Sequence, residues 1–338
     1  MKRIIFTLIV SILASIGVCK SAEMSATAQR NQREFRTEVT KSFSTGDNPS
    51  LQIDNKYGHI RIIEGADNTL SFKIEIIGYG TTEALAKQYA ETTYVFFDLR
   101  DDKITATTVF ESLKCNNCSR KVNYTVVVPK GVTMNLTNKY GNIYLENAIK
   151  PMRIDLKYGN LEANNLANVT IDLKYGNFTV NACEDLKIDC GYAKIKIGRA
   201  NRITTESKYD DFQIGTVSDL MMNTKYTKVK IDKLNYSFVC NDFKYCSLNI
   251  NEISTQFSRI KINSGYTDIK LALDNRHSFK ASLSVRYGTI KADNLIFNNV
   301  TLRNKERNTE AISGIVGSAG NPSATVEITA SYGNIVFN

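Results

Sequence analysis

Residues 139–145 read KYGNIYL, and closely similar heptads return as KYGNLEA at residues 157–163 and KYGNFTV at residues 174–180. From Tyr140 to Tyr287 a tyrosine recurs every 17–21 residues, and Tyr57 and Tyr332 begin the same pattern at a greater distance from the array. The aligned tyrosines are Tyr57, Tyr140, Tyr158, Tyr175, Tyr192, Tyr209, Tyr226, Tyr245, Tyr266, Tyr287 and Tyr332. A period of this length is typical of stacked repeats, in which each unit buries its apolar face against its neighbours.

Two apolar positions follow every aligned tyrosine. The residues three positions after it are Ile60, Ile143, Leu161, Phe178, Ile195, Phe212, Val229, Leu248, Ile269, Ile290 and Ile335. The residues five positions after it are Ile62, Leu145, Ala163, Val180, Ile197, Ile214, Ile231, Ile250, Leu271, Ala292 and Phe337. Apolar residues at every second position indicate strands with one buried face.

Three further features of the sequence fit a coil of strands joined by corners. A third apolar column lies eight residues after the tyrosine, and glycine directly follows six of the tyrosines, where a missing Cβ suits a corner between strands. The four prolines, Pro49, Pro129, Pro151 and Pro322, fall outside the tyrosine-centred strands. The sequence therefore predicts an all-β fold, a right-handed parallel β-helix or β-solenoid of about ten Tyr-Gly coils.

The array is interrupted after its first coil. Residues 81–92 have helical spacing, and extended runs follow at 94–99, 103–110 and 121–128. We interpret residues 23–130 as the first coil with a small N-terminal α+β cap, because an exposed strand edge invites aggregation. Residues 131–338 would then hold the β-solenoid repeats, with a polar, glycine-containing loop inserted near 296–324.

The N-terminus reads as an export signal. Two basic residues precede an apolar run at residues 4–18, which is short for a membrane span. We expect residues 1–22 to be a signal peptide. Lipid attachment at Cys19 stays open, although Val18 departs from the small residue that usually precedes such a cysteine. Membrane anchoring would then involve the N-terminus alone.

These repeats carry a resemblance. The opening LQIDNKYG at residues 51–58, the strand YTVVVPK at residues 124–130 and the serial Lys-Tyr-Gly-Asn units resemble the putative adhesin family of bacterial β-solenoid domains. The similarity spans roughly residues 35–338 and implies a β-solenoid of a family with no established catalytic activity, and it brings no functional residues with it. Ala193, Asp210, Thr227, Cys246 and Thr267 replace the glycine, so those corners are expected to differ in shape.

A basic column directly precedes the tyrosines. We take its members as a candidate outward ligand face: Lys139, Lys157, Lys174, Lys208, Lys225 and Lys244. Two positions earlier, on the same predicted face, lie Asp155, Asp172, Asp189, Glu206 and Asp242. Alternating acid and base columns favour mutual charge balance across strands over a groove for nucleic acid, which is not expected as a partner.

The tyrosines and cysteines have structural interpretations. Strand parity places the tyrosines with the inward Ile and Leu, which predicts a stacked aromatic ladder in or near the core. Cys115 and Cys118 flank a predicted hairpin turn and are candidates for a turn-closing disulfide. Cys183 and Cys190 occupy inward columns as small apolar residues, while the pairing of Cys240 and Cys246 stays open.

Catalysis fits this sequence poorly. The two histidines, His59 and His277, have no nucleophile placed beside them by the repeat, and acids are spread one per coil. We expect a non-catalytic, adhesin-like binding or structural module of the cell envelope, with no metal and no cofactor, whose partner is a glycan or an envelope protein. The alternative is a polysaccharide-degrading β-helix enzyme, a lyase or hydrolase. The expected location is the periplasm, outer membrane or surface of a Gram-negative bacterium.

Overall fold

The computed structural model describes residues 32–338, which form an all-β structure with one helix. The predicted signal peptide, residues 1–22, and Cys19 lie outside the described residues. Two compact units make up the chain, one ending at Asn164 and one beginning at Asn165. Within the described residues, no helix has the length and apolar character needed to cross a membrane.

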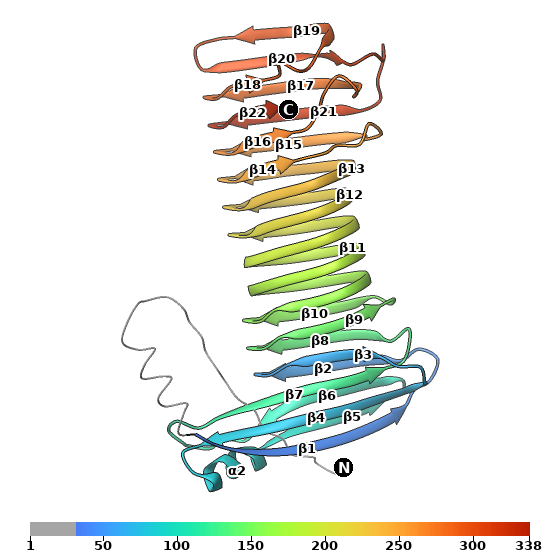
Figure 1. Cartoon of the computed structure of the whole chain (residues 1–338), viewed down its shortest axis with the longest axis vertical. Helices are drawn as coiled ribbons and strands as arrows, with labels where there is room; N and C mark the ends of the chain where they lie inside the picture. Colours follow the sequence, from blue (N-terminus) through green and yellow to red (C-terminus); the bar gives the residue numbers. More distant parts are fainter. Residues whose placement is uncertain (1–31) are drawn as a thin grey trace. The chain divides into compact units, whose positions relative to one another are not determined.

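The first unit contains the single described helix and most of the antiparallel strands. Its elements are β1 (Arg33–Ser44), β2 (Ser50–Lys56), β3 (Ile60–Glu64), β4 (Thr69–Gly80), α2 (Glu83–Glu91), β5 (Thr93–Arg100), β6 (Lys103–Phe110), β7 (Ser119–Val128), β8 (Thr133–Lys139), β9 (Ile143–Ala148) and β10 (Met152–Lys157). The strands pair in two rows. In the first row, β1 pairs antiparallel with β4 and β4 pairs antiparallel with β7, after which β7 pairs in parallel with β3 and β3 with β9 (Figure 1). In the other, β5 pairs antiparallel with β6, followed in parallel by β2, β8 and β10.

The helix expected over residues 81–92 is α2, and the three expected strands are β5, β6 and β7. Thr82 caps the helix by accepting a hydrogen bond from the Leu85 amide. The helix lies close on β4 because Gly78 leaves room for it: a Cβ there would lie 2.0 Å from the Ala86 carbonyl oxygen. This α+β segment therefore packs directly against the strands that extend the first coil.

The second unit is a stack of parallel coils. Its elements are most of β11 (Leu161–Lys208), then β12 (Asp211–Lys225), β13 (Lys228–Lys244), β14 (Ser247–Ile250), β15 (Arg259–Gly265), β16 (Asp268–Leu271), β17 (Phe279–Arg286), β18 (Ile290–Lys291), β19 (Phe297–Lys305), β20 (Thr309–Val316), β21 (Thr325–Ser331) and β22 (Ile335–Phe337). Corresponding residues of successive coils pair in register, as in Ile195 with Phe212 and Phe212 with Val229. All three side chains are buried, so the apolar columns of the sequence form the core.

The last coil of the chain does not lie at the end of the stack. Strand β21 pairs in parallel with both β15 and β17, and β22 pairs with both β16 and β18. The C-terminal residues 325–337 are therefore inserted between two coils that precede them in sequence. Hydrogen bonding on both edges gives this coil the surroundings of an interior one.

The prediction of a loop near residues 296–324 is wrong over most of its length. Strands β19 and β20 form an antiparallel hairpin, and β20 pairs with β17 (Figure 1). The segment looks like a loop in sequence because β19 is exposed along nearly its whole length and needs no apolar alternation. The hairpin covers the edge of β17 that β21 leaves unpaired, so it works as a cap.

We expect the inserted coil to be as protected as the middle of the stack. Amides of β21 should exchange with solvent as slowly as those of β15, although β21 lies close to the C-terminus. Amides of β19, which pairs only with β20 among the described strands, should exchange much faster. Hydrogen exchange followed by mass spectrometry measures all three segments in one experiment. Equal, rapid exchange of β21 and β19 would contradict the insertion.

Candidate functional site

Every aligned tyrosine has a left-handed backbone. Their φ angles lie between 54° and 70°, from Tyr266 at one extreme to Tyr57 at the other. A bulky side chain rarely adopts this conformation, which costs about 1–2 kcal/mol for residues other than glycine. The corner of each coil is therefore made by the tyrosine, and the same strained turn is repeated throughout the stack.

The glycine that follows the tyrosine stands where a Cβ would clash, as expected from the sequence. At Gly141, an added Cβ would lie 1.8 Å from the carbonyl oxygen of Gly58 on the neighbouring coil. At Gly333 it would lie 2.0 Å from the Thr267 carbonyl oxygen. Apart from Gly58, none of the described glycines that follow an aligned tyrosine has a positive φ. Glycine at this position lets adjacent coils approach closely.

Where glycine is replaced, side chains connect the coils. The Ala193 amide donates to Asp210 Oδ1 (2.8 Å), and the Asp210 amide donates to Thr227 Oγ1 (3.4 Å). The Thr227 amide then donates to Cys246 Sγ (3.3 Å), and the Cys246 amide to Thr267 Oγ1 (3.1 Å). The tyrosines at these corners keep φ between 54° and 63°. The prediction that these corners differ in shape is therefore wrong, because a buried polar ladder occupies the same turn.

The tyrosine rings form a continuous stack in the second unit. The rings follow the order Tyr175, Tyr192, Tyr209, Tyr226, Tyr245, Tyr266, Tyr332 and Tyr287. Their centroids lie 4.6–5.0 Å apart, and neighbouring planes differ by only 2–13°. We call these eight rings the tyrosine ladder. In the first unit, Tyr57, Tyr140 and Tyr158 also stack, with centroids 5.1 and 4.9 Å apart.

The ladder lies on the surface. Its eight side chains are 43–54 % exposed, which contradicts the expected position in or near the core. The stacking itself agrees with the sequence-based expectation. The parity argument failed because a residue with positive φ interrupts the alternation of inward and outward side chains, so parity cannot be carried through the tyrosine.

Stacking leaves the ring edges and hydroxyls as the accessible part of the ladder. Interior rings have both faces against other tyrosines, so they offer no face for a sugar to stack on. At Tyr287, the end ring, the Arg286 guanidinium lies over the face at 5.4 Å. In the first unit, Lys56 lies in the same way over Tyr57, at 4.8 Å. A partner must therefore contact a row of phenol edges.

The lysine column beside the tyrosines is largely neutralised. The ion pairs in this column are Lys157–Asp155 (3.4 Å), Lys174–Asp172 (3.6 Å), Lys174–Asp189 (2.6 Å), Lys225–Asp242 (2.9 Å) and Lys244–Asp242 (2.9 Å). Lys139 and Lys208 have no carboxylate within 4.0 Å among the described residues. The structure thus brings most of the lysine column together with the acidic column, which favours charge balance over a polyanion groove.

The described cysteines are either joined in a disulfide or are free thiols, Cys246 among them, whose pKa is raised chiefly by burial. A disulfide joins Cys115 and Cys118 in the loop before β7. Burial raises the pKa of the Cys183 and Cys240 thiols to about 12, and it also raises the pKa of Cys190. Cys183, Cys190 and Cys240 are free and buried within the stack, where they act as small apolar residues.

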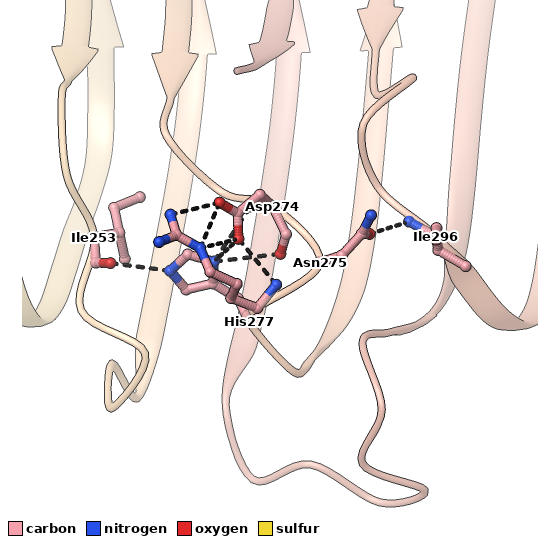
Figure 2. A network of polar contacts seen from close by, with 6 residues as sticks. Ile253, Asp274, Asn275, His277 and Ile296 are labelled. Carbon is pink, nitrogen blue, oxygen red and sulfur yellow. Dashed lines mark hydrogen bonds and ion pairs between the residues drawn. The ribbon is translucent and has the colours of Figure 1, made fainter.

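The two histidines hold backbone in place. His277 is buried, and its Nε2 lies 2.9 Å from the Ile253 carbonyl oxygen while its Nδ1 faces Asp274 (Figure 2). His59 Nδ1 accepts a hydrogen bond from the Asn142 amide (3.3 Å), and burial lowers the pKa of His59. Within residues 32–338, no group of three His, Cys, Asp or Glu side chains is arranged to hold a metal ion.

Replacing the Tyr226 ring should show how much backbone strain and how much ring stacking contribute to the free energy of unfolding. Tyr226→Asn loses two ring contacts, worth about 0.5–1.5 kcal/mol each, but gains a residue that tolerates positive φ. Tyr226→Ala loses the contacts and keeps the strain. We expect Tyr226→Phe to unfold like the wild type, Asn to be slightly less stable, and Ala to be about 1 kcal/mol less stable than Asn. Urea denaturation measures the order. Equal stability of Asn and Ala would contradict the role of backbone strain.

Asp210 should make stability depend on pH. Burial raises the pKa of the Asp210 carboxyl, and this effect outweighs the hydrogen bond from the Ala193 amide, which lowers it. The folded protein therefore holds the proton more tightly than the unfolded chain does. The free energy of unfolding therefore falls as pH rises from the ordinary range of an aspartate through the raised pKa. Asp210→Asn should remove this fall, because the amide oxygen can still accept from Ala193. Denaturation at a series of pH values measures the difference.

Asp242 provides a control of opposite sign. The hydrogen bond from Lys244, followed by that from Lys225, lowers the pKa of Asp242. Its contribution to stability is present above the ordinary range of an aspartate and is lost as pH falls through the lowered pKa. Asp242→Asn should therefore lower stability at neutral pH, where Asp210→Asn raises it. Shifts of the same sign in both variants would rule out burial as the cause at Asp210.

A family model and several solved structures match this chain. The family model described as Toastrack DUF4097 matches residues 48–337. No curated protein matches the chain. Among solved structures, an adhesin described as putative from Parabacteroides merdae is 14 % identical and covers 69 % of this chain and 88 % of its own, with a TM-score of 0.33. Another such adhesin, from Bacteroides fragilis, is 13 % identical and covers 88 % of this chain and 97 % of its own, with a TM-score of 0.30.

The family match covers nearly all the described residues, from the approach to β2 through β22. It confirms the resemblance that the Tyr-Gly units carry in the sequence. The chain belongs to the Toastrack DUF4097 family.

Proposed function

We propose that this protein is a non-catalytic, adhesin-like binding module of the cell envelope and that the tyrosine ladder is its contact surface. In this proposal residues 1–22 direct export, and the coils wind as a right-handed parallel β-solenoid of about ten turns, the hand that parallel crossovers prefer. The protein works in the periplasm, in the outer membrane or on the surface of a Gram-negative cell. The observation that carries the proposal is the exposure of eight stacked rings along one unit.

The exposed area of the ladder supports a contact surface. A tyrosine side chain has an area of about 200 Å², so eight half-exposed rings present on the order of 800 Å². Single apolar patches on monomeric proteins are usually about 300–600 Å². One partner in a standard protein interface contributes about 800 Å². Tyrosine is also enriched at such interfaces, because its ring is apolar and its hydroxyl can form hydrogen bonds.

The backbone supports the same proposal. At a position with φ near 56°, glycine or asparagine would avoid the strain that Tyr226 and Tyr245 accept. Ring stacking offsets much of this strain, but it does not require a half-exposed site. Strained residues that recur on a surface are a recognised mark of functional positions. The ladder combines strain, exposure and regular spacing in one set of side chains.

The proposal predicts ladder-dependent binding to the envelope. The triple variant Tyr192→Asn, Tyr226→Asn, Tyr245→Asn interrupts the ladder with residues that tolerate positive φ. We expect its retention on envelope preparations from the native host to fall at least tenfold, as measured by co-sedimentation. The matched control is Tyr236→Asn, because Tyr236 is 52 % exposed and lies outside the ladder. Wild-type retention of the triple variant would disprove the proposal.

A further inference from the structure

The spacing of the ladder restricts what can contact all of it. Neighbouring rings lie 4.6–5.0 Å apart, which is the distance between adjacent strands in a β-sheet. An extended peptide running along the ladder rises ~3.3 Å per residue and turns a side chain to the same face only every ~6.6 Å, and one strand of DNA repeats every ~3.4 Å. Either polymer would lose register within a few units. A second stack of paired strands repeats at the same interval as the ladder and keeps register along its full length.

The exposure of ring edges, and not of ring faces, also favours a second stack of strands as the partner. The faces of the interior rings are covered by other tyrosines, so an incoming ligand meets hydroxyls and ring edges. A second row of ring edges can interleave with the first in a dry contact, as side-chain ladders do between paired β-sheets. Each hydroxyl can then find a hydrogen-bond partner on the opposing row, which a flat apolar surface would not provide.

The charges beside the ladder permit two identical surfaces to meet. Lys225 and Lys244 both pair with Asp242, and Lys174 pairs with Asp172 and Asp189. A column that carries both signs at close range has little net field to repel a copy of itself. If the lysines were unpaired, two such surfaces would face each other with several like charges. The charge balance that disfavours a polyanion partner therefore favours self-association.

The exposed area of the tyrosine ladder is also large enough for a stable protein–protein interface. The order of 800 Å² that the ladder presents equals one side of a standard interface, before any flanking side chain is counted. Identical surfaces meeting about a two-fold axis form a closed dimer, because each ladder is fully used by the other. We propose that the partner of the tyrosine ladder is the ladder of a second copy of this chain. This inference rests on the proposed function and names its partner, so that adhesion between cells would be homophilic.

Sedimentation velocity of the mature chain over a range of micromolar concentrations tests self-association directly. We expect the wild type and Tyr236→Asn to form dimers. The Tyr192/Tyr226/Tyr245→Asn variant should have a dimer dissociation constant raised at least 100-fold, because each substitution removes contacts on both sides of the two-fold axis. The matching triple Tyr→Phe variant keeps the ring edges and should still dimerise more strongly than the triple Asn variant. Circular dichroism and hydrogen exchange establish that each variant is folded.

A second arm separates this inference from the proposed function. Beads carrying wild-type protein are mixed with like beads, with beads carrying the triple Asn variant, and with native-host cells from which the gene is deleted. Clustering of wild-type beads only with one another supports the inference. A monomeric wild type that still binds the deletion cells through its ladder overturns the second copy as partner and leaves the proposed function intact. Dimers unaffected by the triple variant overturn the ladder as the self-interface, and ladder-independent binding to cells overturns the proposed function.

Discussion

The structure depends on one backbone turn that each coil makes in the same way. At each corner a tyrosine holds φ near 56°, and the next residue passes close to the neighbouring coil. The strain of about 1–2 kcal/mol per tyrosine is set against about one ring contact per residue, worth 0.5–1.5 kcal/mol. The two effects nearly cancel. The regular geometry that aligns the apolar columns is therefore tied to the regular geometry that aligns the rings.

The sequence contains enough to predict the core, because inward columns follow strict spacing on either side of each corner. It also contained a sign of the turn itself. Leu156 and Leu161 are both buried, yet they are five residues apart, an odd number that unbroken alternation cannot place on one face. A non-extended residue must lie between them. Counting across the corner would have placed Tyr158 outside the alternation, and thus outside the core.

Other parts of the structure depend on contacts that no local pattern encodes. The C-terminal coil has an aligned tyrosine followed by apolar positions, as its neighbours do, so nothing in residues 325–337 distinguishes insertion from addition at the end. Hairpin β19–β20 is equally hidden, because the exposed strand β19 has no buried face to reveal it. The pairing of the acidic and basic columns could be predicted from the sequence, since opposite charges at fixed offsets on adjacent strands must meet. Which of them faces a partner could not be read from spacing.

A repeated surface recognises its partner through its period. In the tyrosine ladder no ring is special, so discrimination comes from the number of contacts that stay in register along the stack. A partner whose repeat differs from 4.8 Å by a third, as an extended peptide does, gains only the first few contacts. The order of the coils then matters more than any one side chain. By inserting its last coil between Tyr266 and Tyr287, the chain extends the ladder without interruption, and the hairpin closes the edge beyond it.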